Sequence, residues 1–301
     1  MSQSTKQAPL FKRFLAIGVG LIGGSACLSA KKQGLVGYVL GYSRRFETSH
    51  QALSLGIIDE CISDASDPNL RSVDAVLLSI PVRQYEAVLR QFLPVLPANA
   101  LIFDAGSTKN DVSLVVDKLE HEFPGLKARF VGAHPIAGGE QNGPKAAVAG
   151  LYQDKTCVIC ADPKTDISRK KLVEKFWSAL GSKLVEMDPL DHDEMFGAVS
   201  HLPHLLSFAY VSSVLEHPKG AKFMSEGGAG FRDFTRIAAS SPEMWADIFQ
   251  NNDKALLSLL DNFEETLKQW RSAIQNKDRK FLDQALKRAS EYREGWPNGH
   301  V

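Results

Sequence analysis

The chain has no excess of charge of either sign. Lys plus Arg and Asp plus Glu each number 35 in 301 residues, so the formal net charge at neutral pH is zero. Proteins that bind nucleic acid or an anionic membrane usually carry a surplus of basic residues, and this sequence indicates neither partner. Its 44% hydrophobic and 23% charged residues are typical of a globular protein, and its length allows two domains.

Cysteine is also scarce, with only Cys27, Cys61, Cys157 and Cys160. The last two have the C-x-x-C spacing of redox and zinc sites. They lie, however, in an apolar stretch that predicts a buried strand, where positions three apart point to opposite faces. Since no second Cys/His pair lies nearby, we predict two core cysteines, no metal site, and a protein of the reducing cytoplasm.

A hydrophobic run long enough to span a membrane is missing from the N-terminal region. Residues 14–27 follow basic residues and resemble a secretory signal, but the run is too short for a membrane span. The alternative is a buried first strand that enters a glycine loop. The regular series of strands and helices that follows favours this alternative, because cleavage near Cys27 would remove the first strand of the fold.

Short apolar runs alternate with helical patterns through the first half of the chain. The predicted strands cover residues 13–17, 36–42, 75–80, 100–104, 129–133, 156–161 and 183–187. Such alternation indicates βαβ units and a parallel sheet with helices on both faces. We therefore predict an α/β fold with an N-terminal Rossmann-type domain.

The first predicted strand runs into a glycine motif, G-x-G-x-x-G, that opens a helix. Gly18 permits the tight turn, Gly20 lets the backbone approach a pyrophosphate, and Gly23 lets helix and strand pack closely. Leu21 and Ile22 lie in the first turn of the helix, whose free N–H groups and dipole favour phosphate. These five residues predict a dinucleotide site.

The end of the second predicted strand bears on which dinucleotide binds. NAD sites usually have Asp or Glu here to bind the ribose 2′-hydroxyl. This chain has Ser43, Arg44 and Arg45 instead, a hydroxyl and two guanidinium groups that suit a 2′-phosphate. We therefore favour NADP and keep NAD as the alternative.

Three loops are expected at the edge where ligands bind in open α/β sheets, beyond the carboxyl ends of the strands. The first contains Ser79 and Pro81, which we expect to contact the cofactor. The second contains Ser107, which is either the N-cap of the next helix or a hydroxyl beside nicotinamide and substrate. The third contains His134, a residue type that commonly serves as general base.

After residue 188 the alternation stops and helical patterns follow one another. We therefore predict a dinucleotide-binding domain over residues 10–188 and an all-α dimerisation and substrate domain over residues 189–297. Its surplus of apolar helix faces predicts a homodimer. Pro203 lies inside the first long helical pattern, where it removes the donor for the Val199 carbonyl and predicts a kink.

Five motifs, read in order from Phe14 to Trp245, resemble the prephenate/arogenate dehydrogenases of tyrosine biosynthesis. They are GVGLIGGS, DAGSTK, HPIAGGE, HDEMFGAVSHLPH and GFRDFTRIAASSPEMW. The resemblance implies a helical, dimeric C-terminal domain and a small-molecule substrate. Some members carry an added regulatory ACT domain, which we do not expect in this chain.

The resemblance also implies roles for individual residues. His134 corresponds to the residue that binds the ring hydroxyl of the substrate and takes its proton, and Ser107 assists at that hydroxyl. Arg236 corresponds to a residue on a substrate carboxylate. The expected substrate contacts are His204, Arg236, Ser200, His192 and Trp245.

The implied reaction is oxidative decarboxylation of prephenate to 4-hydroxyphenylpyruvate, or of arogenate to tyrosine, with hydride transfer to NAD(P)⁺. The two substrates differ only in a keto or amino group, and both stay open. One alternative is a β-hydroxyacid-type dehydrogenase, which would use a Lys on a C-terminal helix where this chain offers His, Ser and Arg. The other is a non-catalytic NADP-binding sensor, which would not need His134, Ser107 and Arg236 together.

Overall fold

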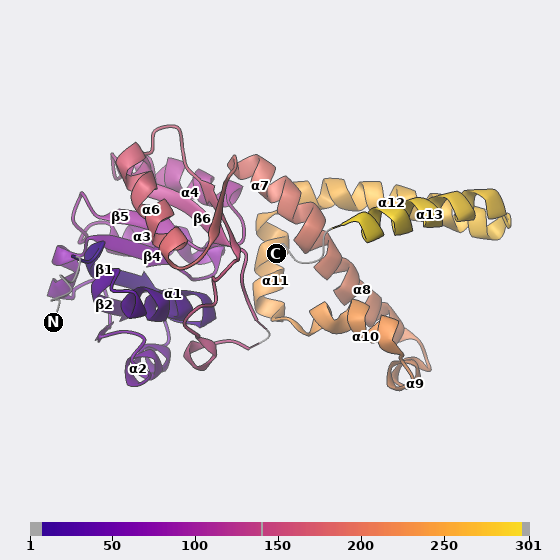
Figure 1. Cartoon of the computed structure of the whole chain (residues 1–301), viewed down its shortest axis with the longest axis horizontal. Helices are drawn as coiled ribbons and strands as arrows, with labels where there is room; N and C mark the ends of the chain where they lie inside the picture. The colour runs from indigo at the N-terminus through magenta and orange to yellow at the C-terminus, as the bar shows by residue number, and fades with distance from the viewer. Residues whose placement is uncertain (1–7, 140, 297–301) are drawn as a thin grey trace, which may run out of the picture. The chain divides into compact units, whose positions relative to one another are not determined.

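The computed structural model describes residues 8–139 and 141–296 of the chain. Eight strands form one sheet in the order β3-β2-β1-β4-β5-β6-β7-β8 (Figure 1). The strands are β1 (Phe11–Ile17), β2 (Val36–Tyr42), β3 (Glu60–Ile62), β4 (Ala75–Leu78), β5 (Leu101–Asp104), β6 (Phe130–Pro135), β7 (Thr156–Cys160) and β8 (Lys183–Glu186). All seven predicted strands are present, and β3 is an addition, because three residues are too few to show a period.

Helices cover both faces of this sheet, as the sequence predicts. They are α1 (Leu21–Lys32), α2 (Phe46–Ser54), α3 (Tyr85–Phe92), α4 (Asn110–Glu120), α5 (Leu126–Arg129) and α6 (Ile167–Ala179). Successive side chains of β1 enter opposite cores. Phe14 packs in the core that includes α1 and α6, and Leu15 in the core that includes α3 and α4.

The prediction of a parallel sheet is wrong at one edge. β7 pairs antiparallel with β6, and β8 then runs parallel to β7. A parallel neighbour needs a crossover connection, usually a helix. The described residues between β6 and β7 contain only the short 3₁₀ turn η3 (Pro144–Ala146), so the chain turns back beside β6 instead of crossing the sheet.

The strand order places β1 between β2 and β4, and the connections run outward from β1 in both directions. This reversal of strand order is the switch point at which doubly wound sheets bind dinucleotides. The Rossmann-type prediction is therefore confirmed, and the loops that follow β1, β2 and β4 line the expected binding edge.

The chain forms two compact units that are not continuous in sequence. One extends to Asp193 and also takes Ser240–Asn251, and the other comprises Glu194–Ala239 and the described residues from Asn252 on. The first unit thus contains α11 (Pro242–Asn251) and the start of α7 (Pro189–Phe196). These units differ from the two continuous stretches predicted on either side of residue 188, because α11 packs on the 3₁₀ turn after β4, η2 (Val82–Gln84).

The second unit is helical throughout its described elements. These are a π-helical turn η4 (Gly197–His201), α8 (Leu202–Glu216), α9 (Gly220–Ser225), α10 (Ala229–Thr235), η5 (Arg236–Ala239), α12 (Asp253–Gln275) and α13 (Arg279–Gly295). The π-helical turn interrupts the long helix predicted there. Pro203 follows this turn as the second residue of α8, so the irregular turn lies where the proline is predicted to disturb the helix.

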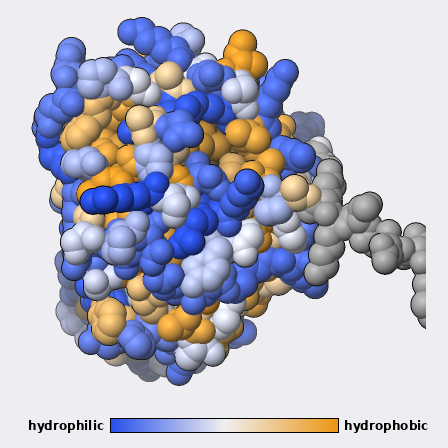
Figure 2. All heavy atoms as spheres, turned by 90° about the vertical axis from the view of Figure 1, so that its left-hand side faces the viewer, coloured by the Kyte–Doolittle hydropathy of each residue, from blue (hydrophilic) through white to orange (hydrophobic). Residues whose placement is uncertain are grey.

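Large apolar side chains are exposed on this helical unit. Val199, Leu215, Leu257 and Ile274 are each between 57% and 65% exposed. Among the described helices, the run Pro189–Glu216 alone is long and apolar enough to cross a membrane by length and composition. The face of the molecule in Figure 2, by contrast, shows hydrophobic residues in separate patches between hydrophilic ones.

Candidate active site

The glycine loop between β1 and α1 has the shape that a dinucleotide requires. Gly18 has φ +96°, and a Cβ built there would lie 2.1 Å from the carbonyl oxygen of Ser79. A Cβ on Gly23 would lie 2.0 Å from the carbonyl oxygen of Gly18, so helix and strand touch closely. A Cβ on Gly20 would meet nothing within 4 Å, which leaves open space beside the loop.

A pyrophosphate fits this open space. Gly20 is the N-cap of α1 and offers no side chain to the first-turn N–H groups, which are therefore available to an anion. Leu21 begins the helix, and a Cβ on Gly139 would lie 3.6 Å from its Cδ2. The segment that follows β6 therefore approaches the glycine loop. The residues present fit a nicotinamide dinucleotide, which the structure does not contain.

The loop after β2 lies next to this site, because the N–H of Gly18 donates to the carbonyl oxygen of Tyr42 at 2.9 Å. Arg44 and Arg45 follow and are exposed. Within the described residues, neither guanidinium pairs with a carboxylate. Two cations without such partners are suited to an additional phosphate.

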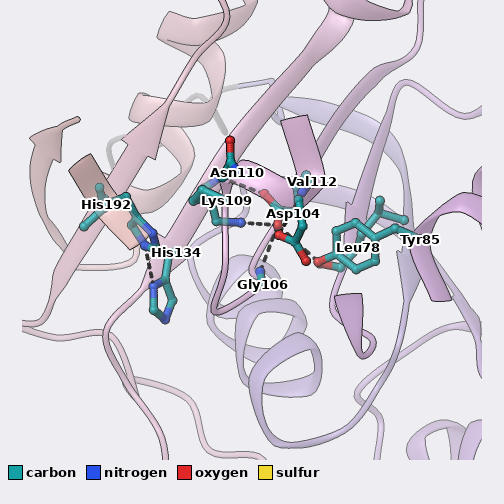
Figure 3. Close-up of polar contacts among 12 residues, drawn as sticks. Leu78, Tyr85, Asp104, Gly106, Lys109, Asn110, Val112, His134 and His192 are labelled. Atoms are coloured by element: carbon teal, nitrogen blue, oxygen red, sulfur yellow. Dashed lines mark hydrogen bonds and ion pairs between the residues drawn. The ribbon is translucent and has the colours of Figure 1, made fainter. Parts of the chain in front are cut away.

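Asp104 ends β5 and is fully buried, and it accepts hydrogen bonds from three other segments (Figure 3). Its Oδ1 accepts from the N–H of Ala133 at 2.7 Å, directly before His134. Its Oδ2 accepts from the N–H of Gly106 at 2.9 Å and from the Tyr85 hydroxyl at 3.1 Å, and pairs with Lys109. Burial, with the Asp104 charge, holds the pKa of Tyr85 well above its usual value. Asp104 thus joins the loop of Ser107 to the strand of His134.

Ser107 does not cap the following helix. α4 begins at Asn110, and the N–H groups of Lys109 and Asn110 donate to Asp193 Oδ1 and Oδ2 at 2.8 and 2.9 Å. Asp193 therefore fills the place of an N-cap side chain. Ser107 is half-buried and makes no hydrogen bond to another described residue, so its hydroxyl is available to a ligand.

His134 lies inside β6 and not in a loop after it, because the pairing with β7 continues one residue beyond it, to Pro135. Its Nδ1 is 2.9 Å from Nε2 of His192. His192 is fully buried, and its Nδ1 is 2.7 Å from Asp193 Oδ1. Burial lowers the pKa of His192, and the bond to Asp193 opposes that shift. Figure 3 shows this contact as a dashed line between the two imidazole rings.

Trp245 lies on α11, in the same compact unit, and is 6% exposed. Arg83, just after Pro81, pairs with Glu243 and Asp247 of this helix at 3.1 Å each. Burial raises the pKa of Asp247, and the Arg83 charge opposes that rise. Arg83 therefore fixes the helix that carries Trp245 to the loop that follows β4.

His204, Ser200 and Arg236 lie in the helical unit. Nδ1 of His204 is 2.8 Å from the Ser200 carbonyl oxygen, to which it donates. Burial lowers the pKa of His204, and the nearby Arg236 charge lowers it further. The neighbouring His201 is buried and its Nδ1 accepts from the Asn252 amide at 2.9 Å, so the two imidazoles of this segment serve different partners.

Comparison with known families agrees with this geometry. Residues 26–186 match the family model described as prephenate dehydrogenase, nucleotide-binding domain, and residues 188–288 match prephenate dehydrogenase, dimerization domain. The chain belongs to the prephenate dehydrogenase family. It is therefore a dehydrogenase with a nucleotide-binding and a dimerisation domain.

Individual relatives match over almost the whole length. A cyclohexadienyl dehydrogenase of Zymomonas mobilis is 32% identical over 97% of this chain and 98% of its own. A prephenate dehydrogenase from A. aeolicus, solved with hydroxyphenyl propionate and NAD⁺, is 35% identical, with a TM-score of 0.86 and coverage of 97% and 99%. An arogenate dehydrogenase from Synechocystis is 25% identical, with a TM-score of 0.77 over 94% of this chain and 99% of its own.

Four residues of the site were not predicted from the sequence. Asp104 and Lys109 lie within the DAGSTK motif, Asp193 lies within HDEM, and Arg83 lies after Pro81. The motifs around Asp104, Lys109 and Asp193 could have pointed to these three residues. The contacts themselves join residues far apart in sequence, 84 residues for Lys109 with Asp193 and 160 residues for Arg83 with Glu243. Glu140, the last residue of HPIAGGE, lies outside the described residues.

Proposed function

We propose that the protein catalyses the oxidative decarboxylation of prephenate, arogenate or both, in tyrosine biosynthesis. The observation that supports this most directly is the position of His134. It lies on β6, whose following segment approaches the glycine loop, and it is held by His192 in a unit that belongs to the dehydrogenase family. A base beside a nicotinamide is what oxidation of a ring alcohol needs.

In the proposed reaction, Nε2 of His134 accepts the proton of the ring hydroxyl, and Ser107 hydrogen-bonds the same oxygen. A bound nicotinamide supplies the acceptor for the hydride from the ring carbon. Loss of CO₂ leaves its electron pair in the ring and makes it aromatic. The phenolate oxygen then recovers a proton from His134, so that the base returns to its starting state.

We propose that Arg236 binds a carboxylate of the substrate, because a guanidinium presents two parallel N–H donors to two oxygens. His204 donates through Nδ1 to Ser200, so its Nε2 has the lone pair in the neutral ring and suits a substrate hydroxyl. Trp245 and the side chain of Ser200 are proposed as further contacts.

The experiment that tests this function is a four-way assay at 340 nm, with prephenate or arogenate and with NAD⁺ or NADP⁺. We expect a rise in absorbance that requires both substrate and nucleotide. Nucleotide binding without turnover of either substrate would support the sensor alternative. Oxidation of a β-hydroxyacid, without oxidation of prephenate or arogenate, would support the β-hydroxyacid-type dehydrogenase.

We propose that NADP⁺ is preferred over NAD⁺, on the basis of Ser43, Arg44 and Arg45. Replacing both arginines by Ala is expected to lower kcat/KM for NADP⁺ by roughly 10- to 100-fold, the effect of losing charge-assisted hydrogen bonds, and to change NAD⁺ little. Arg71→Ala, at an exposed arginine of the same unit, is the matched control. An equal loss with both nucleotides would contradict a 2′-phosphate site.

We propose that two copies of the chain associate through the helical unit, and that the protein acts in the cytoplasm, where its four free cysteines stay reduced. The exposed apolar side chains of α8 and α12 supply the surface. Light scattering at micromolar concentration is expected to give twice the chain mass of 33.0 kDa, and a monomer at that concentration would contradict the dimer.

A further inference from the structure

We propose that His192 and Asp193 are positioning residues that hold His134 in the tautomer with its proton on Nδ1, so that Nε2 is the atom that accepts the substrate proton. This inference rests on the proposed function for its catalytic consequence. The tautomer itself follows from hydrogen bonds within one compact unit, and it can be measured without substrate.

The chain of bonds starts at the Asp193 carboxylate. Its two oxygens accept from the backbone N–H groups of Lys109 and Asn110, which can only donate. Each oxygen of this carboxylate thus faces a donor and serves as an acceptor. Toward His192 it therefore acts as an acceptor as well, and Nδ1 of His192 must carry the hydrogen in the 2.7 Å contact.

The next bond fixes the second ring. His192 is fully buried, and burial of an imidazole favours its neutral form, which has one N–H only. With the hydrogen on Nδ1, Nε2 of His192 has a lone pair. The 2.9 Å contact with Nδ1 of His134 then requires the hydrogen on His134. The neutral His134 ring therefore presents an unprotonated Nε2.

This order of bonds supports proton transfer in the forward direction. When Nε2 of His134 takes the substrate proton, the ring becomes an imidazolium whose Nδ1–H already points at an acceptor. The bond to His192, polarised by the Asp193 carboxylate, becomes stronger as the charge develops. No proton needs to move to Asp193, because the added proton stays on His134 until the phenolate recovers it.

The same bonds change the role expected for His192. The resemblance gives it as a substrate contact, yet both of its ring nitrogens are used, one by His134 and one by Asp193. Other charged or titratable groups near the three residues include Asp104, Lys109, Asp111, Cys157 and Cys160, and Asp188, just before α7, accepts from the N–H of His192 at its carbonyl oxygen. Burial raises the pKa of Asp111 to about 6, so tautomers are best measured above pH 7.5.

The first test reads the tautomer directly by NMR of the full chain labelled with [¹⁵N]histidine, with the His134 signals assigned by their loss in His134→Asn. We expect the Nδ1-protonated form in the unsubstituted protein. In Asp193→Asn one of the two acceptor oxygens becomes a donor, while the N–H groups of Lys109 and Asn110 still need two acceptors. The bond that holds the hydrogen on Nδ1 of His192 is therefore weakened, and we expect both tautomers of His134 to appear. The Nε2-protonated form in the unsubstituted protein would overturn the proposal.

The second test measures rate. Where a carboxylate fixes the tautomer of a catalytic histidine, the Asp→Asn change lowers kcat by about 10⁴ through the wrong tautomer. We expect a loss of roughly 10²- to 10⁴-fold in kcat for Asp193→Asn, with the KM values for substrate and nucleotide within about threefold. Asp191→Asn, at an exposed carboxylate of the same helix, is the matched control and should leave kcat unchanged.

A third variant separates tautomer control from capping of α4. His192→Phe removes both ring nitrogens but leaves the backbone bonds to Asp193 in place. We expect it to lower kcat and to randomise the His134 tautomers, while the melting temperature stays near that of the unsubstituted protein. Full activity in this variant would overturn the proposal. If the protein oxidises neither prephenate nor arogenate, the proposed function fails, and the NMR result still decides the tautomer.

Discussion

Replacing His134 by Asn is expected to lower kcat by about 10²- to 10⁴-fold, the usual contribution of a positioned general base. Asn keeps a hydrogen-bonding side chain of similar reach but cannot accept a proton near neutral pH. The interaction that is lost exists mainly in the transition state, so KM should change by less than about threefold. Steady-state kinetics with the better of the two substrates measures both quantities.

Arg236→Ala is the comparison for this experiment. We expect it chiefly to raise the KM for substrate, because a carboxylate contact is made in the ground state and the transition state alike. The two variants should therefore separate, one in kcat and the other in KM. Equal and small effects from both would refute the assigned roles.

Replacing Lys109 by Met is expected to destabilise the first compact unit by about 3–5 kcal/mol, since removing one partner of a buried ion pair leaves the other charge uncompensated. Lys109 is 1% exposed and Asp104 is fully buried. The loss should appear as a lower midpoint in urea unfolding followed by tryptophan fluorescence. A fall in kcat should accompany it, because Asp104 holds the backbone on both sides of the site, at Gly106 and Ala133.

The matched control lies on α4, the helix that follows Lys109. Lys118 pairs with Glu86 at 2.6 Å but is 59% exposed, so water and salt screen the pair. Lys118→Met should leave the unfolding midpoint unchanged. A fall in the midpoint with Lys118→Met as large as that with Lys109→Met would contradict the ion-pair explanation.

The sequence by itself determined the class of fold and the dinucleotide site. Short apolar runs and helical patterns reflect which faces each element buries, and that signal is local. The glycine loop is local too, because turn, close approach and packing depend on Gly18, Gly20 and Gly23 themselves. Five motifs in order were sufficient to indicate the family, and the matches to both domain models confirmed it.

Only the tertiary structure decided how the site is held together. The direction of β7 depends on the absence of a crossover in the described residues after β6, which no periodicity records. Asp193 reaches α4 across 84 residues of sequence, and His192 reaches His134 across 58. Hydrogen-bond partners that are this remote in sequence are chosen by the packing of whole elements. The sequence could therefore propose His134 as the base, whereas the residues that orient its ring became visible only in the folded chain.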